Sequence, residues 1–78
     1  MSTDTKREPW LVEAGSRFTT LRRAKGLSIR ELSRMSGVAR QTITKLEKGI
    51  AFPGSPVRVA LGDVLGVENL GRVLLEER

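Results

Sequence analysis

Hydrophobic residues recur every three or four positions along most of the chain, which is the spacing of α-helices that bury one face. The first such segment begins at Pro9, a residue tolerated in the first turn of a helix, and extends to Ala24. Four further segments follow, over residues 28–36, 40–48, 55–65 and 69–77. The chain shows neither the alternating pattern of strands nor an internal repeat. We therefore expect a compact, all-α, five-helix domain over residues 9–78, preceded by a flexible polar arm over residues 1–8.

The hydrophobic side of each segment gives the expected core. In the first segment we expect Trp10 and Phe18 to pack inside. In the two short segments that follow, the inward residues are Leu32, Met35, Ile43 and Leu46. Phe52, in the loop before the fourth segment, is also expected to reach the core. Gly15 is expected to interrupt the first helix only weakly.

Residues 26–49 contain the clearest signals for where helices begin and end. Ser28 and Glu31 have the spacing of a capping box, in which each side chain bonds the backbone N–H of the other residue. Gly37 is suited to the left-handed conformation that ends a helix, and Gly49 repeats this signal. Ser55 and Pro56 have the pattern of a cap and first turn for the fourth helix. The sequence thus predicts two short helices, 28–36 and 40–48, joined by a turn of about three residues.

Positive charge is concentrated on these two helices and on the few residues that precede them. The chain carries 14 Lys and Arg against nine Asp and Glu, a net charge of +5. Eight of the basic residues lie between Arg22 and Lys48, against only Glu31 and Glu47 in the same span, so the rest of the chain is close to neutral. A basic cluster that coincides with two capped helices favours a nucleic-acid partner over a merely solvated face.

The composition argues against an enzyme. Without cysteine or histidine the chain has no disulfide, no zinc site of the usual ligand types, no thiol nucleophile and no imidazole base. Of the carboxylates, Glu31 is used by its cap, and Glu76 and Glu77 lie on a terminal helix. The glycines stand singly at helix ends and bends, so no glycine-rich phosphate loop is present. We expect no catalytic activity, no metal and no cofactor.

No apolar run approaches the roughly 18 residues that span a bilayer, and the first eight residues do not have the pattern of a signal peptide. We therefore expect a cytoplasmic protein that does not associate with membranes. We also expect no small-molecule ligand, because the five helices leave no segment for binding an inducer.

Two short helices joined by a glycine turn, the second carrying polar and basic residues outward, match the helix-turn-helix that places a recognition helix in the DNA major groove. Residues 18–75 resemble the Cro/repressor-type (XRE-like) helix-turn-helix domain of bacterial and phage regulators. The resemblance rests on Leu21-Arg22, Gly26-Leu27-Ser28, Glu31-Leu32, Gly37-Val38, Thr42-Ile43, Leu46-Glu47-Lys48-Gly49, Pro53 and Leu65-Gly66-Val67. It implies a lambda-repressor-like fold with the motif at about 28–48.

The resemblance also implies a role for individual residues. The expected base-reading residues share the exposed N-terminal and central face of the 40–48 helix, and they are Arg40, Gln41, Thr44 and Lys45. The expected phosphate contacts are the backbone N–H groups near Ile29 and Arg30 and the side chains of Arg34, Thr42, Lys48 and Arg23. Arg22 and Glu47 are expected to form a partly buried ion pair that ties the first helix to the third.

Two residues depart from the family pattern. Ile29 stands where a glutamine often reaches a phosphate, so it offers only its backbone N–H or an apolar contact with a sugar or a thymine methyl group. Ala39 stands where a serine or threonine usually caps the recognition helix, which costs about 1 kcal/mol of helix stability. Side-chain hydrogen bonds are therefore not expected from these two positions.

One such domain covers only a few base pairs, so a homodimer on a palindromic site is expected. The expected dimer surface combines the last helix with the end of the fourth, and its residues are Val67, Leu70, Val73 and Leu74. The other interpretation of these residues is that they close the core of the monomer.

The sequence as a whole predicts a sequence-specific regulator of transcription that binds double-stranded DNA in the major groove, a small homodimeric repressor. The alternative is a protein-interaction module with the same fold, such as an antitoxin or regulatory partner. RNA polymerase or a toxin would then be the protein partners. The operator, the sign of regulation and the circuit stay open, since a phage repressor, a restriction-modification controller, an antitoxin and an anti-CRISPR-associated regulator share this size and fold.

Overall fold

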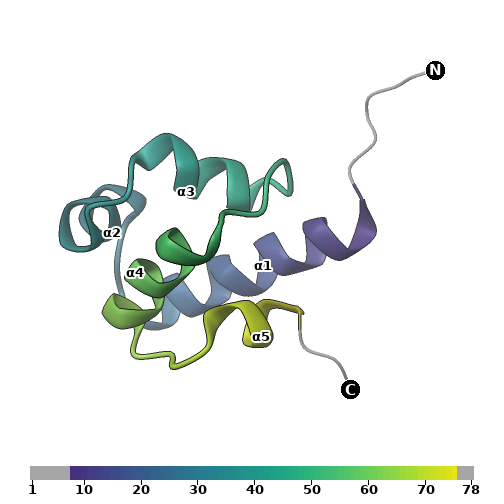
Figure 1. The fold of residues 1–78 in the computed structure, drawn as a ribbon. Coiled ribbons are helices and arrows are strands. Elements are labelled where there is room, and N and C mark those ends of the chain that lie inside the picture. The colour runs from purple at the N-terminus through teal and green to yellow at the C-terminus, as the bar shows by residue number, and fades with distance from the viewer. Residues whose placement is uncertain (1–7, 76–78) are drawn as a thin grey trace.

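The structure, a computed structural model, describes residues 8–75, and these form five α-helices (Figure 1). The helices are α1 (Pro9–Ala24), α2 (Ile29–Ser36), α3 (Arg40–Glu47), α4 (Ser55–Leu65) and α5 (Leu70–Leu75). No strand occurs within residues 8–75. The prediction of an all-α domain with five helices is therefore confirmed. The arm expected over residues 1–8 lies, except for Glu8, outside the described residues, as do Glu76 and Glu77.

The long helix α1 lies between α3 on one side and α5 on the other (Figure 1). Helix α2 packs against α3 and α4, and α4 packs against α5. All five helices contribute to one core, whose largest fully buried side chains are Phe18, Leu32, Ile43, Leu46, Leu61 and Leu74. The core therefore holds α3 by its inner side and leaves the outer side of that helix to solvent.

The ends of α2 follow the signals in the sequence. The backbone N–H of Glu31 donates to the Ser28 Oγ at 3.0 Å, and the backbone N–H of Ser28 donates to the Glu31 carboxylate at 2.9 Å. Gly37 ends the helix in the left-handed region, with φ at 79°. The predicted capping box and glycine stop are both confirmed, so the length and direction of α2 are fixed locally.

The N-cap of α4 and the start of α5 differ slightly from the prediction. Gly54, and not Ser55, occupies the N-cap of α4, so that Pro56 lies in the first turn without a side-chain cap before it. Helix α5 begins at Leu70, one residue later than expected, and is described as far as Leu75. Its predicted end at residue 77 lies outside the described residues.

Two residues expected in the core are exposed. Met35 is 57% exposed because the buried side of α2 is formed by Ile29, Leu32, Ser33 and Ser36, and Met35 lies off that stripe. Trp10 is 48% exposed and lies in the first turn of α1, where it makes an edge contact with Phe52, with ring centroids 5.6 Å apart. The apolar spacing correctly predicted helices at both positions, but the prediction that these two side chains are buried was wrong.

Gly15 has a role that the sequence did not reveal. A Cβ atom at this position would contact the Leu46 carbonyl oxygen and lie 2.8 Å from the Glu47 carbonyl oxygen. Both obstacles are backbone atoms, so they cannot move aside as a flexible side chain would. The absence of a side chain at Gly15 therefore lets α1 approach the last turn of α3 closely.

Candidate nucleic-acid interface

Helix α3 presents polar side chains on one side because its apolar residues occupy the other. Ile43 and Leu46 are fully buried in the core. On the outer side the exposed residues are Arg40, Gln41, Lys45 and Lys48, with Thr44 half-buried among them. The four predicted base-reading residues thus occur on one continuous face of α3, although Thr44 is less accessible than the others.

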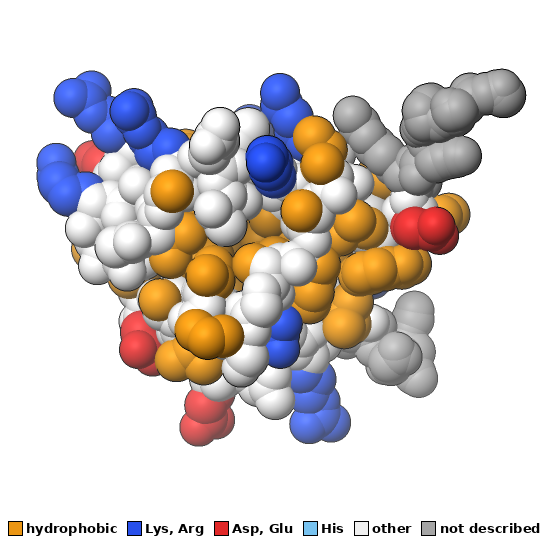
Figure 2. All heavy atoms as spheres, turned by 45° about the horizontal axis from the view of Figure 1, so that its top comes forward, with side chains coloured by type: hydrophobic (Ala, Val, Ile, Leu, Met, Phe, Trp, Pro, Cys, Tyr) orange, Lys and Arg blue, Asp and Glu red, His pale blue; other side chains and the backbone are white. Residues whose placement is uncertain are grey.

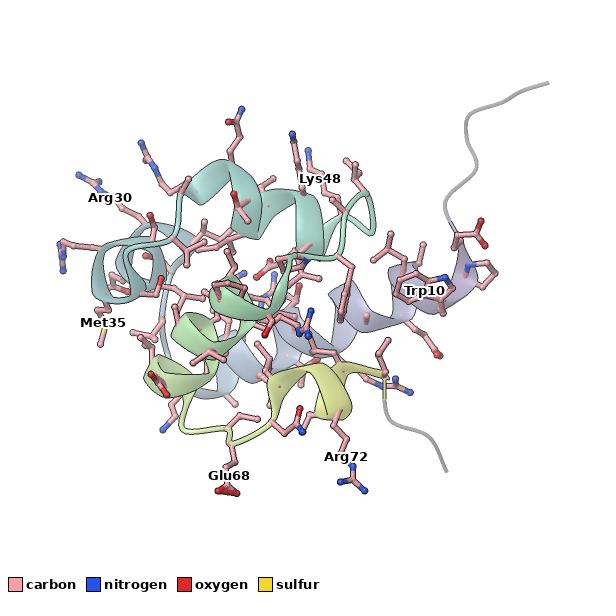
Figure 3. The ribbon with its side chains drawn as sticks, in the orientation of Figure 1. Trp10, Arg30, Met35, Lys48, Glu68 and Arg72 are labelled. Carbon is pink, nitrogen blue, oxygen red and sulfur yellow. The ribbon has the colours of Figure 1, made fainter. Side chains whose placement is uncertain are left out.

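Basic residues of α2 extend this face. Arg30 and Arg34 are exposed, and in Figure 3 Arg30 points to the same side of the molecule as Lys48 at the end of α3. Figure 2 shows Lys and Arg side chains gathered along the edge that α2 and α3 form. Arg23 is exposed at the end of α1, whereas Ile29 and Thr42 are half-buried. The surface has the positive charge that a phosphate backbone requires.

The turn between α2 and α3 is held by hydrogen bonds that sequence reasoning missed. The Ser33 hydroxyl donates to the Val38 carbonyl oxygen at 2.6 Å, and the Val38 backbone N–H donates to the Ser36 Oγ at 3.1 Å. Together with the buried Val38 side chain, these hydrogen bonds fix the angle between the two helices of the motif.

Helix α3 begins without a side-chain cap. Its N-cap residue is Ala39, which accepts the backbone N–H groups of Thr42 and Ile43 with its carbonyl but has no side-chain acceptor. This agrees with the departure from the family pattern noted in the sequence. The first turn of α3 is therefore positioned by packing and by the serine bonds of the turn.

Arg22 and Glu47 form the predicted ion pair between α1 and α3. The Arg22 Nε donates to Glu47 Oε2 at 2.8 Å and Nη2 donates to Oε1 at 3.1 Å, while Nη1 donates to the Leu27 carbonyl oxygen at 2.8 Å. Both side chains are about 10% exposed. Hydrogen bonding to Glu47 raises the pKa of Arg22, so the guanidinium remains charged. One side chain thereby connects α1, α3 and the segment that leads into α2.

A comparison with protein families identifies the fold around this site. The family model described as helix-turn-helix matches residues 20–68, which is more than half of the chain. The chain belongs to the Cro/repressor-type helix-turn-helix family. The match covers the whole of α2, α3 and α4, and it excludes α5 and the first part of α1. A search of curated proteins finds no match.

Membership of the helix-turn-helix family makes this protein a DNA-binding regulator. The described residues hold no group of three or more side chains suited to a metal ion. Within the same residues, no helix has the length and apolar character needed to cross a bilayer. The features that the structure does bring together are the polar side of α3 and the basic residues of α2.

The predicted dimer surface needs a correction. Leu70 and Leu74 are 3% and 0% exposed because α5 turns both side chains into the core between α1 and α4. Of the four predicted residues, Val67 is half-buried, and only Val73, 38% exposed, presents a substantial surface. Leu70 and Leu74 thus close the core of this helix-turn-helix domain and are not available to a partner.

The Glu31 cap makes a testable contribution to stability. The pKa of the Glu31 carboxyl is lowered, first by the hydrogen bond from the Ser28 backbone N–H and then by the Ser28 side chain. A carboxyl with a lower pKa in the folded state stabilises that state above its unfolded pKa, and this contribution is lost as the pH falls through the folded pKa.

We therefore expect Glu31→Gln to have a lower Tm than the native chain at pH 6, with the difference shrinking as the pH falls below about 4. Thermal melting followed by circular dichroism at several pH values measures this. A difference in Tm that is the same at pH 6 and at pH 3 would contradict the role of the ionised carboxylate.

Proposed function

We propose that this helix-turn-helix protein is a transcriptional repressor that binds a palindromic operator as a homodimer, with α3 in the major groove. The observation that carries the proposal is the outer side of α3, where Arg40, Gln41 and Lys45 are all exposed. Arg30 of α2 lines the same hollow as Arg40 and Gln41, and Arg34 is exposed one turn further along α2. Such a surface suits duplex DNA, which presents anionic phosphates next to the hydrogen-bonding edges of bases.

The chemistry of the side chains gives each a role in this proposal. Arg40 and Lys45 donate to guanine O6 and N7, Gln41 pairs with adenine N6 and N7, and Thr44 contacts a thymine methyl group. Phosphates are bound around them by the backbone N–H groups of Ile29 and Arg30 and by the side chains of Arg34, Thr42, Lys48 and Arg23. Phosphate contacts fix the register of the domain, and base contacts select the sequence.

Repression follows from occupancy alone. A dimer bound over a promoter excludes RNA polymerase, so the proposal requires no catalytic step and no bound small molecule. This is consistent with a chain that has no histidine or cysteine for such chemistry.

Selection of bound DNA from a random pool tests the proposed function. We expect an enriched site made of two inverted half-sites whose centres lie about 34 Å, or one helical turn, apart. A pool without any enriched sequence would refute sequence-specific binding and favour the protein-interaction module. A single enriched half-site without an inverted copy would refute the dimer.

The symmetry of such a complex restricts where the two copies touch. Two α3 helices that enter successive major grooves on one side of the duplex are related by a two-fold axis that passes between them. The dimer contact must therefore lie beside the DNA-facing side. Helix α5 lies on the far side of α1 from α3 (Figure 1), so its surface is poorly placed for this contact.

Exposed apolar side chains do lie beside the C-terminal end of α3. We call them the tryptophan patch, which consists of Trp10, Val12, Ile50 and Phe52. Trp10, Val12 and Ile50 are 48%, 44% and 49% exposed, and Trp10 meets Phe52 edge to face. Val12 packs against Gly49, which brings the start of α1 next to the loop after α3. Three large exposed apolar side chains at the start of α1 and in the loop after α3 favour a protein contact, and we propose that a second copy covers them.

The only tryptophan of the chain lies in this patch, and the chain has no tyrosine, so intrinsic fluorescence reports on Trp10 alone. We expect its emission to shift to shorter wavelength as the protein concentration rises, in parallel with dimer formation in sedimentation. Ile50→Lys is expected to weaken the dimer at least tenfold, because it places a charge in an apolar contact.

Val59→Lys is the matched control, since Val59 is 61% exposed on α4 outside the patch. Sedimentation as a monomer at micromolar concentration, with and without DNA, would refute the proposed homodimer. If Val59→Lys weakened the dimer and Ile50→Lys did not, the dimer contact would lie outside the tryptophan patch.

A further inference from the structure

A shallow hollow lies on the DNA-facing side between the start of α2 and the start of α3. Its lining residues are Ile29, Arg30, Ala39, Arg40, Gln41 and Thr44. Three of these are predicted base readers, so the hollow belongs to the proposed reading surface. Two others, Ile29 and Ala39, are the positions at which the chain departs from the family pattern. The departures therefore occur together in one place in the fold.

Two of the side chains that line the hollow, Ile29 and Ala39, are apolar and held in position, and we call them its floor. Ile29 is half-buried and packs against the hydrophobic core, so its side chain cannot swing away as that of the exposed Arg30 can. Ala39 presents only a methyl group and ends the turn that the Ser33 and Ser36 hydrogen bonds hold. Neither side chain can donate to a phosphate or to a base edge. A ligand group that fits this floor must itself be apolar.

The major groove presents one apolar group, the 5-methyl group of a pyrimidine, which occurs on thymine and on 5-methylcytosine. Arg40 lines the same hollow and is exposed, so its guanidinium is available to a guanine next to that methyl group. Neighbouring base pairs are 3.4 Å apart along the duplex, which is short compared with the reach of an arginine side chain.

We propose that Ile29 and Ala39 form a methyl-reading site that selects a 5-methylpyrimidine in the base pair adjacent to the guanine bound by Arg40. This inference rests on the proposed function, since it names a base that the same surface reads. It assigns to Ile29 a role in specificity in place of the phosphate contact that a polar side chain would make there.

The test uses the duplex obtained by selection and replaces each thymine in turn by deoxyuridine, which lacks only the methyl group. At the position read by Ile29 and Ala39, one in each half-site and distinct from any thymine that Thr44 contacts, we expect binding to each half-site to weaken about fourfold, the ratio that corresponds to burial of one methyl group. Cytosine at the same position should bind weakly, and 5-methylcytosine should bind better than cytosine. Preference for thymine over 5-methylcytosine identifies thymine as the natural ligand, and the reverse order identifies the methylated cytosine.

The variant Ile29→Ala removes most of the floor. Its ratio of affinities for thymine and deoxyuridine at that position should fall to about one, while its binding to random duplex DNA is retained. Met35→Ala is the matched control, because Met35 is exposed on the same helix outside the hollow. It should preserve the fourfold ratio. If Ile29→Ala does not fold, as judged by circular dichroism, the deoxyuridine scan with the native chain still tests whether a methyl group is read.

Three results would overturn the inference. If deoxyuridine changed the binding affinity at no position, Ile29 would contact only a sugar or nothing on the DNA. The proposed function would stand in that case, because the protein would still have selected an operator. An undiminished methyl preference in folded Ile29→Ala would place the methyl contact elsewhere, such as at Thr44. Failure to select any site would refute the proposed function and this inference with it.

Discussion

Replacing Arg22 by alanine is expected to lower the free energy of unfolding by about 3 kcal/mol, the low end of the range for removing one partner of a buried ion pair. The substitution leaves the Glu47 carboxylate, about 10% exposed, without the two hydrogen bonds that it now accepts. It also removes the donor that the Leu27 carbonyl uses. An unpaired buried charge costs more than the pair contributes, so the loss should exceed that of an ordinary surface substitution.

Urea unfolding of the native chain, Arg22→Ala and Arg23→Ala measures this expectation. Arg23 is the adjacent residue and is exposed, so its loss should change stability by less than about 0.5 kcal/mol. The double variant Arg22→Met with Glu47→Leu should regain much of the stability, because it leaves no stranded charge. If Arg22→Ala and Arg23→Ala behaved alike, the ion pair would be only a surface contact.

The same residues show why the local structure could be predicted from the sequence. The bounds of α2 depend on Ser28, Glu31 and Gly37, and each acts on backbone groups no more than three or four residues away. Such signals work before any tertiary contact forms. The polar side of α3 was predictable for a related reason, since burial of Ile43 and Leu46 leaves a short helix only one face for solvent.

The predictions that the structure contradicts concern contacts between helices. Whether Met35, Trp10 or the leucines of α5 are buried depends on which helix lies opposite, and periodicity alone does not contain that information. Gly15 was taken as a weak helix former, although its significance is the carbonyl oxygen of Glu47 on another helix. The ion pair of Arg22 was anticipated through the family resemblance and not through its spacing, because 25 residues separate the partners.

The hollow at the start of α3 illustrates the same division within the site. From the sequence, Ile29 and Ala39 were two separate departures from a family pattern, each defined by a lost hydrogen bond. Only the angle between α2 and α3, held by Ser33 and Ser36, brings them together beside Arg40. A position that lacks a polar contact then becomes a candidate for an apolar one.

Replacing Arg40 by lysine is expected to weaken binding to each half-site of the selected operator by about fivefold to 150-fold, which corresponds to the 1–3 kcal/mol that a bidentate contact with guanine contributes. Lysine keeps the positive charge but has no planar fork of donors for O6 and N7. Binding to random duplex DNA should therefore change little. The operator preference should relax at one base pair in each half-site and nowhere else.

Arg34→Ala gives the opposite pattern, because the exposed Arg34 side chain is one of those expected to bind phosphate. Its loss should weaken operator and random DNA alike and lower the slope of log K against log salt by about one unit. Titrations of both duplexes at several salt concentrations distinguish the two variants. Equal losses on operator and random DNA for Arg40→Lys would refute base reading by Arg40, because loss of a base contact should weaken binding to the operator alone. The two variants thus distinguish a residue that binds phosphate from a residue that recognises a base.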